Sequence, residues 1–168
     1  DKKGDWARSV ESVREVGRVA QDCGVAYCLE VLNRFEGYLL NTAEEAVEFV
    51  KQVDIPSVKV MLDTFHMNIE EDSIGGAIRT AGPLLGHFHT GECNRRVPGQ
   101  GRTPWREIRD ALHDIGYDGT VVMEPFVRMG GTVGSDIKIW RDMSHGATEA
   151  ELDRDAHNSV NFLRYVLE

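Results

Sequence analysis

The chain has 168 residues, of which 41% are hydrophobic and 28% charged, and its 28 acidic and 19 basic side chains give a formal charge of −9. This composition is that of a globular protein and is too apolar for a disordered chain. The acidic balance argues against binding to nucleic acid or an anionic membrane, because both need clustered positive charge. With no apolar run near the roughly 18 residues of a membrane span and no recognisable signal peptide, we expect a cytoplasmic protein with reduced cysteines.

Apolar residues follow helical and strand spacing in alternation along the chain. A stripe at three- to four-residue intervals predicts a helix from Trp6 to Cys23, which Gly24 ends. The short apolar run 25–31 predicts a strand that is buried on both faces. The later elements are a helix from Thr42 to Val53 with a capping-box spacing to Glu45, a strand at 58–63, a loop and a short helix at 74–81, a strand at 84–89, a helix opened by a capping Thr103 and Pro104 and ended by Gly116, a strand at 120–124, a glycine-rich loop and a final helix from Leu152 to Leu167.

The strict alternation of strands and helices predicts an α/β fold with parallel strands and helical crossovers. The strands end at residues 30, 63, 89 and 124, so the repeat is about 31 residues, and eight such units would have the usual size of a (β/α)₈ barrel. A doubly wound open sheet is the alternative, but it usually carries a glycine-rich turn after its first strand, where this chain has Leu-Asn-Arg-Phe-Glu. We therefore expect residues 1–168 to form a single partial domain, the C-terminal half of a TIM barrel, without the four N-terminal units.

Each predicted strand ends in a residue that can bind a metal ion, namely Glu30, Asp63, His89 and Glu124. Side chains at the carboxyl ends of parallel strands converge on one face, so these four should meet. Clustered carboxylates repel one another and are unfavourable to bury without a compensating cation or hydrogen bonds, which predicts a metal site. The alternative is that each is simply the first polar residue after its strand. Oxygen and imidazole donors without a thiolate favour Mn²⁺, Co²⁺ or Mg²⁺.

Three further polar residues follow these candidate ligands by three to six positions, namely Glu36, His66 and Arg95. Loops over the carboxyl face of a barrel hold the substrate, so we predict that these side chains contact it. The alternative for each is a solvated loop charge. Cys93 is interpreted as an ordinary loop thiol, and His87 is expected to face away from the site and to pack behind it.

Four segments carry a resemblance to a known family. They are Cys28–Glu36, Val60–Glu71, Gly86–Gly99 and Val122–Phe126, and together they resemble the ketose 3-epimerases. The tail 130–142 fits the D-psicose branch of the family. The resemblance runs over essentially all 168 residues, although members of the family are longer than this chain.

The resemblance implies a xylose-isomerase-like TIM barrel that binds Mn²⁺ or Co²⁺ through Glu30, Asp63, His89 and Glu124. It implies substrate contacts from Glu36, His66 and Arg95, a small-molecule ketose as the partner, and a homo-oligomer, either a dimer or a tetramer.

The reaction implied by the resemblance is the metal-dependent epimerisation of free ketohexoses at C3, as between D-psicose and D-fructose. Removing the C3 proton and returning one on the opposite face requires two flanking carboxylates, with a cis-enediolate between the two steps. Glu30 and Glu124 are the two glutamates of the candidate ligand set, and we assign them as the acid and the base. Two alternatives stay open: another metal-dependent barrel enzyme, such as a sugar isomerase or an endonuclease, and an inactive half-barrel.

Overall fold

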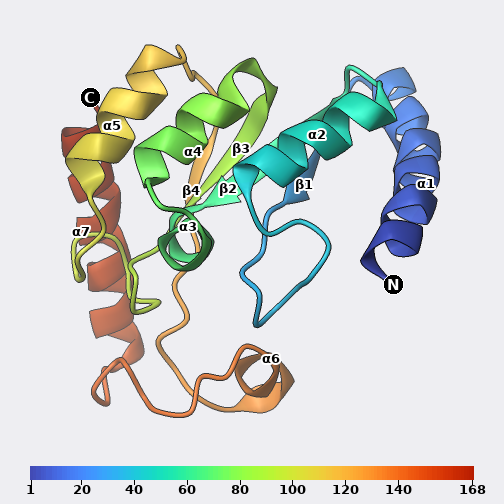
Figure 1. Cartoon of the computed structure of the whole chain (residues 1–168). Helices are drawn as coiled ribbons and strands as arrows, with labels where there is room; N and C mark the ends of the chain where they lie inside the picture. The colour runs from blue at the N-terminus through green and yellow to red at the C-terminus, as the bar shows by residue number, and fades with distance from the viewer.

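The computed structural model describes all 168 residues as alternating helices and strands (Figure 1). The elements, in chain order, are α1 (Lys2–Asp22), β1 (Tyr27–Glu30), α2 (Ala43–Val53), β2 (Val58–Asp63), α3 (Thr64–Glu70), α4 (Ile74–Ala81), a 3₁₀ turn (Gly82–Leu84), β3 (Leu85–Thr90), α5 (Trp105–Asp114), β4 (Val121–Met123), α6 (Gly131–Asp136) and α7 (Glu149–Leu167). The strands form one parallel sheet in the order β1-β2-β3-β4. The prediction of four parallel strands alternating with helices is confirmed.

The helices are arranged around one face of this sheet. In Figure 1, α2, α4 and α5 lie in front of the strands, and α1 and α7 flank them on either side. Helix α3 and the loop after β1 lie below the strands in this view, and helix α6 lies at its lower end. None of the helices combines the length and the apolar character needed to cross a membrane.

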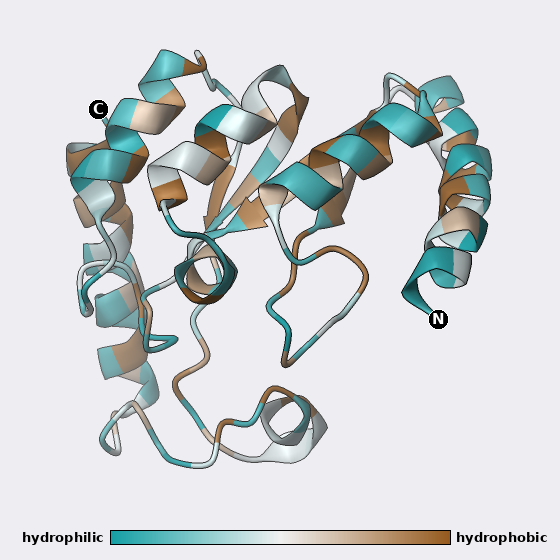
Figure 2. Ribbon diagram, viewed as in Figure 1, coloured by the Kyte–Doolittle hydropathy of each residue, from teal (hydrophilic) through white to brown (hydrophobic).

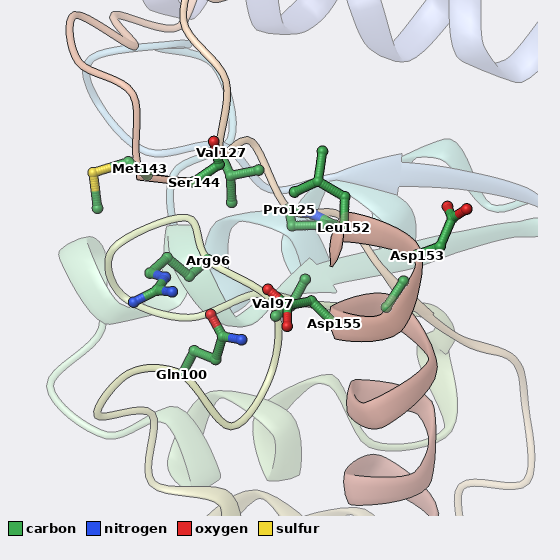
Figure 3. A pocket seen from close by; sticks show the side chains of 11 residues that line it. Arg96, Val97, Gln100, Pro125, Val127, Met143, Ser144, Leu152, Asp153 and Asp155 are labelled. Carbon is green, nitrogen blue, oxygen red and sulfur yellow. The ribbon is translucent and has the colours of Figure 1, made fainter. Parts of the chain in front are cut away.

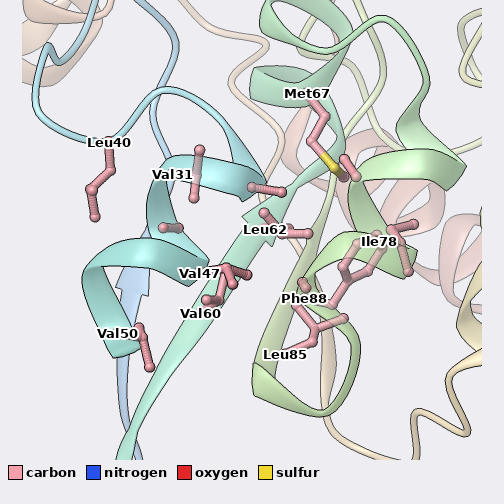
Figure 4. Close-up of a cluster of buried hydrophobic side chains, with 14 of the residues drawn as sticks. Val31, Leu40, Val47, Val50, Val60, Leu62, Met67, Ile78, Leu85 and Phe88 are labelled. Atoms are coloured by element: carbon pink, nitrogen blue, oxygen red, sulfur yellow. The ribbon is translucent and has the colours of Figure 1, made fainter. Parts of the chain in front are cut away.

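The face of the sheet that the helices cover is buried. On β2, the residues Val58, Val60 and Leu62 are buried, whereas the intervening Lys59 and Met61 are half-buried. The buried residues pack with apolar side chains of α2 and α4 in one core (Figure 4), and apolar positions recur in the strands and along the helices between polar turns (Figure 2).

The expectation that the first strand is buried on both faces is wrong. The strand β1 is only Tyr27–Glu30, and none of its residues is buried. Val25, within the run predicted as strand, precedes β1 and is 56% exposed. The reason is that the helices cover a single face of the sheet, so the side chains on the other face stay accessible.

The helix caps in the structure agree only in part with those predicted from the sequence. Thr42 caps α2 as expected, because its hydroxyl accepts a hydrogen bond from the Glu45 N–H at 3.2 Å. The Glu45 carboxylate, however, accepts from Asn41 N rather than from Thr42 N, so the box is incomplete. Thr103 does not cap α5. Its hydroxyl donates to the Gly91 carbonyl oxygen at 3.3 Å, because tertiary contact with the preceding strand competes with capping.

Two helices lie where loops were predicted. The seven residues of α3 and the six of α6 are too few for an apolar stripe to repeat. The longer α7 begins at Glu149, earlier than predicted, because Thr148 and Glu151 form a complete capping box. Of these additions, α3 matters most for function, since it starts directly at the end of β2.

Candidate metal centre

Glu30, Asp63, His89 and Glu124 converge at the carboxyl end of the sheet. Each offers one donor atom, and the four donors all lie within 4.8 Å of one another. The Nδ1 atom of His89 lies 3.9 Å from Asp63 Oδ2 and 4.0 Å from Glu30 Oε1. It lies 3.7 Å from Glu124 Oε2. The predicted convergence of these four side chains is therefore present in the fold.

The strand register explains this convergence. Parallel pairing places Asp63 of β2 directly opposite His89 of β3. Glu124 lies one residue past β4, where its backbone N–H still donates to the Thr90 carbonyl at 3.1 Å and continues the ladder. Glu30 is the last residue of β1 and pairs with Met61. Neighbouring strand ends thus bring donors that are distant in sequence to one place.

The cluster has the chemistry of a cation site. Asp63 Oδ2 and His89 Nδ1 are buried and have no hydrogen-bond partner, although buried polar atoms are nearly always paired. Ligands that lie about 2.1 Å from a divalent cation are separated by roughly 3–4 Å from each other, which is close to the observed donor spacing. The four residues therefore fit a divalent metal ion.

Burial and mutual repulsion act on the protonation of the cluster. Burial, followed by the charges of Glu124 and Asp63, raises the pKa of Glu30 from 4.5 to about 7. Burial also raises the pKa of Asp63 to about 6, against the opposing hydrogen bond from the Phe65 backbone. Burial lowers the pKa of His89, so its imidazole is neutral at pH 7 and keeps a free lone pair. A dication here would favour the charged carboxylates and reverse their shifts.

Arg95, which is buried, and Glu36, which is half-buried, form an ion pair beside the cluster. The Nη2 atom of Arg95 donates to both carboxylate oxygens of Glu36, at 2.9 and 3.1 Å. Its Nη1 atom is buried without a hydrogen-bond partner and lies 3.9 Å from Glu124 Oε2. The guanidinium carbon lies 3.6 Å from the centre of the Phe65 ring. The cation is therefore held on one face by an aromatic ring and keeps donors directed at the cluster.

His66 lies at the same site, on α3. Its side chain is 3% exposed, and its Nε2 atom lies 3.9 Å from Glu30 Oε1. Burial, followed by the positive charge of Arg95, lowers the pKa of His66 to about 4, so that it is neutral at pH 7. All three side chains predicted to contact substrate therefore border the cluster of four candidate metal ligands.

Glu92 organises the loop that carries Arg95, a role that no sequence pattern predicts. The Glu92 side chain is fully buried. Its carboxylate accepts hydrogen bonds from Gly99 N at 2.6 Å, Thr103 N at 3.0 Å and Trp105 Nε1 at 2.9 Å. Arg95 has a φ of 63° and donates its N–H to the Glu92 carbonyl at 2.8 Å. This hydrogen bond closes the left-handed turn at Arg95. Glu92 therefore fixes the backbone from which the Arg95 side chain extends toward the site.

The expectation for His87 is wrong. The ring of His87 lies 5.0 Å from the ring of His89 in an edge-to-face contact, on the same side of the sheet. Side chains two residues apart in a strand point to the same face, which is the physical reason. Cys93 is not one of the four converging residues.

A separate pocket lies next to the site (Figure 3). Its walls come from the loop after β3, the segment after β4 and the first turns of α7, with Arg96, Pro125 and Leu152 among the lining residues. None of the seven predicted site residues lines it. The candidate metal centre is therefore distinct from this pocket, although Arg96 and Pro125 adjoin Arg95 and Glu124 in the chain.

Comparisons with known proteins agree with this arrangement. Residues 1–150 match the family model described as xylose isomerase-like TIM barrel. The chain is 76% identical over 168 residues to the D-psicose 3-epimerase of Ruminiclostridium cellulolyticum, covering 100% of this chain and 57% of that protein. It is 65% identical over 167 residues to the D-psicose 3-epimerase of Agrobacterium fabrum, covering 99% of this chain and 58% of that protein.

A solved structure gives the same result. The crystal structure of D-psicose 3-epimerase with D-tagatose from Clostridium cellulolyticum superposes with a TM-score of 0.98 at 76% identity. The match covers 100% of this chain and 58% of that chain, so the present chain spans little more than half the length of these relatives. The predicted resemblance to ketose 3-epimerases is confirmed, as is the half-barrel of parallel strands. The chain belongs to the xylose isomerase-like TIM barrel family.

Proposed function

We propose that this chain carries the catalytic residues of a metal-dependent ketose 3-epimerase that interconverts free ketohexoses of the D-psicose and D-fructose type. The observation that supports this most is the convergence of four metal-binding donors within 4.8 Å of one another, on a chain 76% identical to a D-psicose 3-epimerase. The proposal concerns the closed barrel to which these four strands contribute, since the chain spans 57% of that relative.

The metal would be held by Glu30, Asp63, His89 and Glu124. We propose Mn²⁺, with Co²⁺ and Mg²⁺ as alternatives, because three carboxylates and one imidazole form a mainly hard ligand set. When bound, a divalent ion would polarise the ketose carbonyl as a Lewis acid. The unpartnered Asp63 Oδ2 and His89 Nδ1 support a cation at this position.

Glu30 and Glu124 would move the proton at C3. One carboxylate takes the C3 proton, and the electrons of the C–H bond form the C2–C3 double bond while the carbonyl oxygen gains negative charge. The other carboxyl group then returns a proton to C3 from the opposite face, and the carbonyl forms again, so the reaction needs no oxidant. The donor atoms of the two glutamates lie within 4.8 Å of each other, which supports their action on one carbon atom.

Glu36, His66 and Arg95 would hold the sugar. The carboxylate of Glu36 can accept from substrate hydroxyls, and Arg95 can donate to an oxygen that gains negative charge during the reaction. The two hydrogen bonds of the ion pair between them support this role, because they fix its geometry before substrate arrives.

The proposal is tested with D-fructose and Mn²⁺ by NMR of the products. Two proteins are used: the chain itself and a chimaera in which the chain replaces the matching part of the Ruminiclostridium cellulolyticum relative, called the completed barrel below. We expect the completed barrel to form D-psicose and, in deuterated water, to incorporate deuterium at C3. Formation of an aldose would favour a sugar isomerase instead, and absence of any C3 exchange would overturn the proposal.

A second candidate is a chain that folds and binds metal without turnover on its own. Its support is an apolar groove between β4 and α7, where Val122 of the edge strand is 38% exposed. The chain would then be inactive alone while the completed barrel is active. Measuring both the solution mass and the turnover of each protein separates the two candidates. The solution mass of the completed barrel also tests our further proposal that the closed barrel is a dimer or tetramer. If the chain alone is an active monomer, this second candidate is excluded.

A further inference from the structure

Asn33 is a buried residue that the proposed reaction does not use. It is 1% exposed and lies in the loop between β1 and α2. Its Nδ2 atom lies 2.9 Å from Glu36 Oε1 and 2.7 Å from His66 Nδ1. Its Oδ1 atom accepts from Phe35 N at 2.9 Å. A backbone N–H can only donate, so the amide oxygen faces Phe35 and the NH₂ group faces Glu36 and His66.

The same residue determines which nitrogen of His66 carries the proton. The backbone N–H of Asn33 donates to His66 Nδ1 at 3.2 Å. Because this donor has no acceptor role, Nδ1 must hold a lone pair, and the proton of the neutral ring is on Nε2. The Nε2–H group is the one directed toward the cluster, 3.9 Å from Glu30 Oε1. Two N–H groups of one residue thus converge on a single ring nitrogen.

We propose that Asn33 is a positioning residue that holds His66 in the Nε2–H tautomer and orients Glu36 at the same time. Its side chain bridges the two residues, and Glu36 in turn accepts both hydrogen bonds from Arg95. Asn33 therefore connects all three side chains that border the metal cluster. The inference rests on the proposed function in one respect: the donor at Nε2 suits a ketose oxygen, which accepts a hydrogen bond.

The test is the protonation pattern of the His66 ring, read from long-range proton–nitrogen correlation spectra of the chain with Mg²⁺, a diamagnetic ion. A His66→Gln variant assigns the signals. We expect an unprotonated Nδ1 and a protonated Nε2 in the wild type. In Asn33→Asp, a carboxylate oxygen replaces the Nδ2 donor, which lies 2.7 Å from His66 Nδ1, while Phe35 N keeps its acceptor. The carboxylate needs a proton on Nδ1, and this charge-assisted hydrogen bond is stronger than the longer one from the backbone N–H at 3.2 Å, so Nδ1 should become protonated.

The chain offers a matched control in the same loop. Asn41 donates through its side chain to the carbonyls of Leu32 and Gly37, at 2.7 and 3.1 Å, and has no hydrogen bond to His66 or Glu36. Asn41→Asp should leave the tautomer unchanged. The loop also retains the anchor between Arg34 and Glu70, whose carboxylate accepts from Arg34 N at 2.7 Å, so Asn33→Asp does not remove the contact between the loop and α3.

In the completed barrel, we expect Asn33→Asp to raise the KM for D-fructose by about tenfold or more relative to Asn41→Asp, because a buried donor and a fixed tautomer are lost. The inference is overturned if the wild-type His66 ring is protonated at Nδ1. It is also overturned if Asn33→Asp has the same His66 ring spectrum as the wild type, or if Asn41→Asp changes that spectrum as much as Asn33→Asp does. The wild-type spectrum decides the matter even if the variant does not fold. If the completed barrel shows no turnover while the His66 tautomers are as expected, the proposed function is contradicted and the tautomer assignment is still supported.

Discussion

The two carboxylate oxygens of Asp63 have different roles: Oδ1 accepts a hydrogen bond from the Phe65 backbone N–H at 2.7 Å, and Oδ2 is buried without a hydrogen-bond partner. The first contact begins α3, the helix that carries His66. The second oxygen faces His89 Nδ1 at 3.9 Å. One side chain therefore links the end of a strand, the start of a helix and the candidate metal centre.

Substitution of Asp63 should separate these two tasks. Asp63→Asn keeps an oxygen for the Phe65 N–H and therefore keeps the cap, whereas Mn²⁺ binding should be lost with the charge. Asp63→Ala removes the cap as well and should lower the free energy of unfolding by a further amount of about 1 kcal/mol. Urea unfolding in EDTA and metal titration measure the two effects. Equal stability of the two variants would show that the cap has no energetic role.

The pKa of Glu30 predicts a specific dependence of stability on pH. Its folded-state pKa of about 7 lies above the usual 4.5, so between these values the metal-free folded state holds a proton that the unfolded state has released. The contribution of Glu30 to stability therefore falls as pH rises through this window. Glu30→Gln removes this dependence.

We expect metal-free Glu30→Gln to gain stability relative to the wild type as pH increases from 5 to 7.5. Comparing the two proteins by urea unfolding in EDTA at each pH cancels the titrating groups that do not interact with Glu30. A gap that stays constant across this range would contradict the raised pKa. Adding Mn²⁺ should reverse the order at pH 7.5, since the carboxylate form is then stabilised.

Glu92 should be important for stability and for the placement of Arg95. Glu92→Ala leaves two buried N–H groups, of Thr103 and Trp105, and the half-buried N–H of Gly99 without an acceptor, and we expect a loss on the order of 2–4 kcal/mol in the free energy of unfolding. Glu92→Gln should lose less, because one oxygen can still accept. The control is Glu107→Ala, which removes an acceptor from an exposed hydrogen bond of the Ser73 hydroxyl and a half-buried one of Gly75 N. If the two alanine variants are equally stable, the buried carboxylate does not hold the loop.

Glu30→Gln and Glu124→Gln test the assignment of acid and base in the completed barrel. Loss of a general acid or base should lower kcat for D-fructose by about 10²–10⁴-fold. Glu44→Gln, on the exposed side of α2, makes the same chemical change away from the site and should keep wild-type kcat. Near-native kcat in either site variant would show that the two-glutamate assignment is wrong.

The sequence predicts the frame of the site better than its interior. Strand ends at or next to residues 30, 63 and 89 are recognisable because short apolar runs stop close to a ligand-type residue, and parallel pairing then brings these residues together. The contacts of Asn33 with His66 join residues 33 positions apart, and no local pattern encodes such a pair. The short α3 begins on a side chain of β2, and the tertiary position of Thr103 overrides its capping tendency.

The most direct test of the metal centre is calorimetric titration of Mn²⁺ into the metal-free chain and two histidine variants. We expect one ion per chain in the wild type and in His87→Ala, whose ring touches His89 without being one of the four converging donors, and no binding in His89→Ala. Absence of manganese uptake by the wild type, or equal loss in both variants, would contradict a metal centre built from the four strand ends.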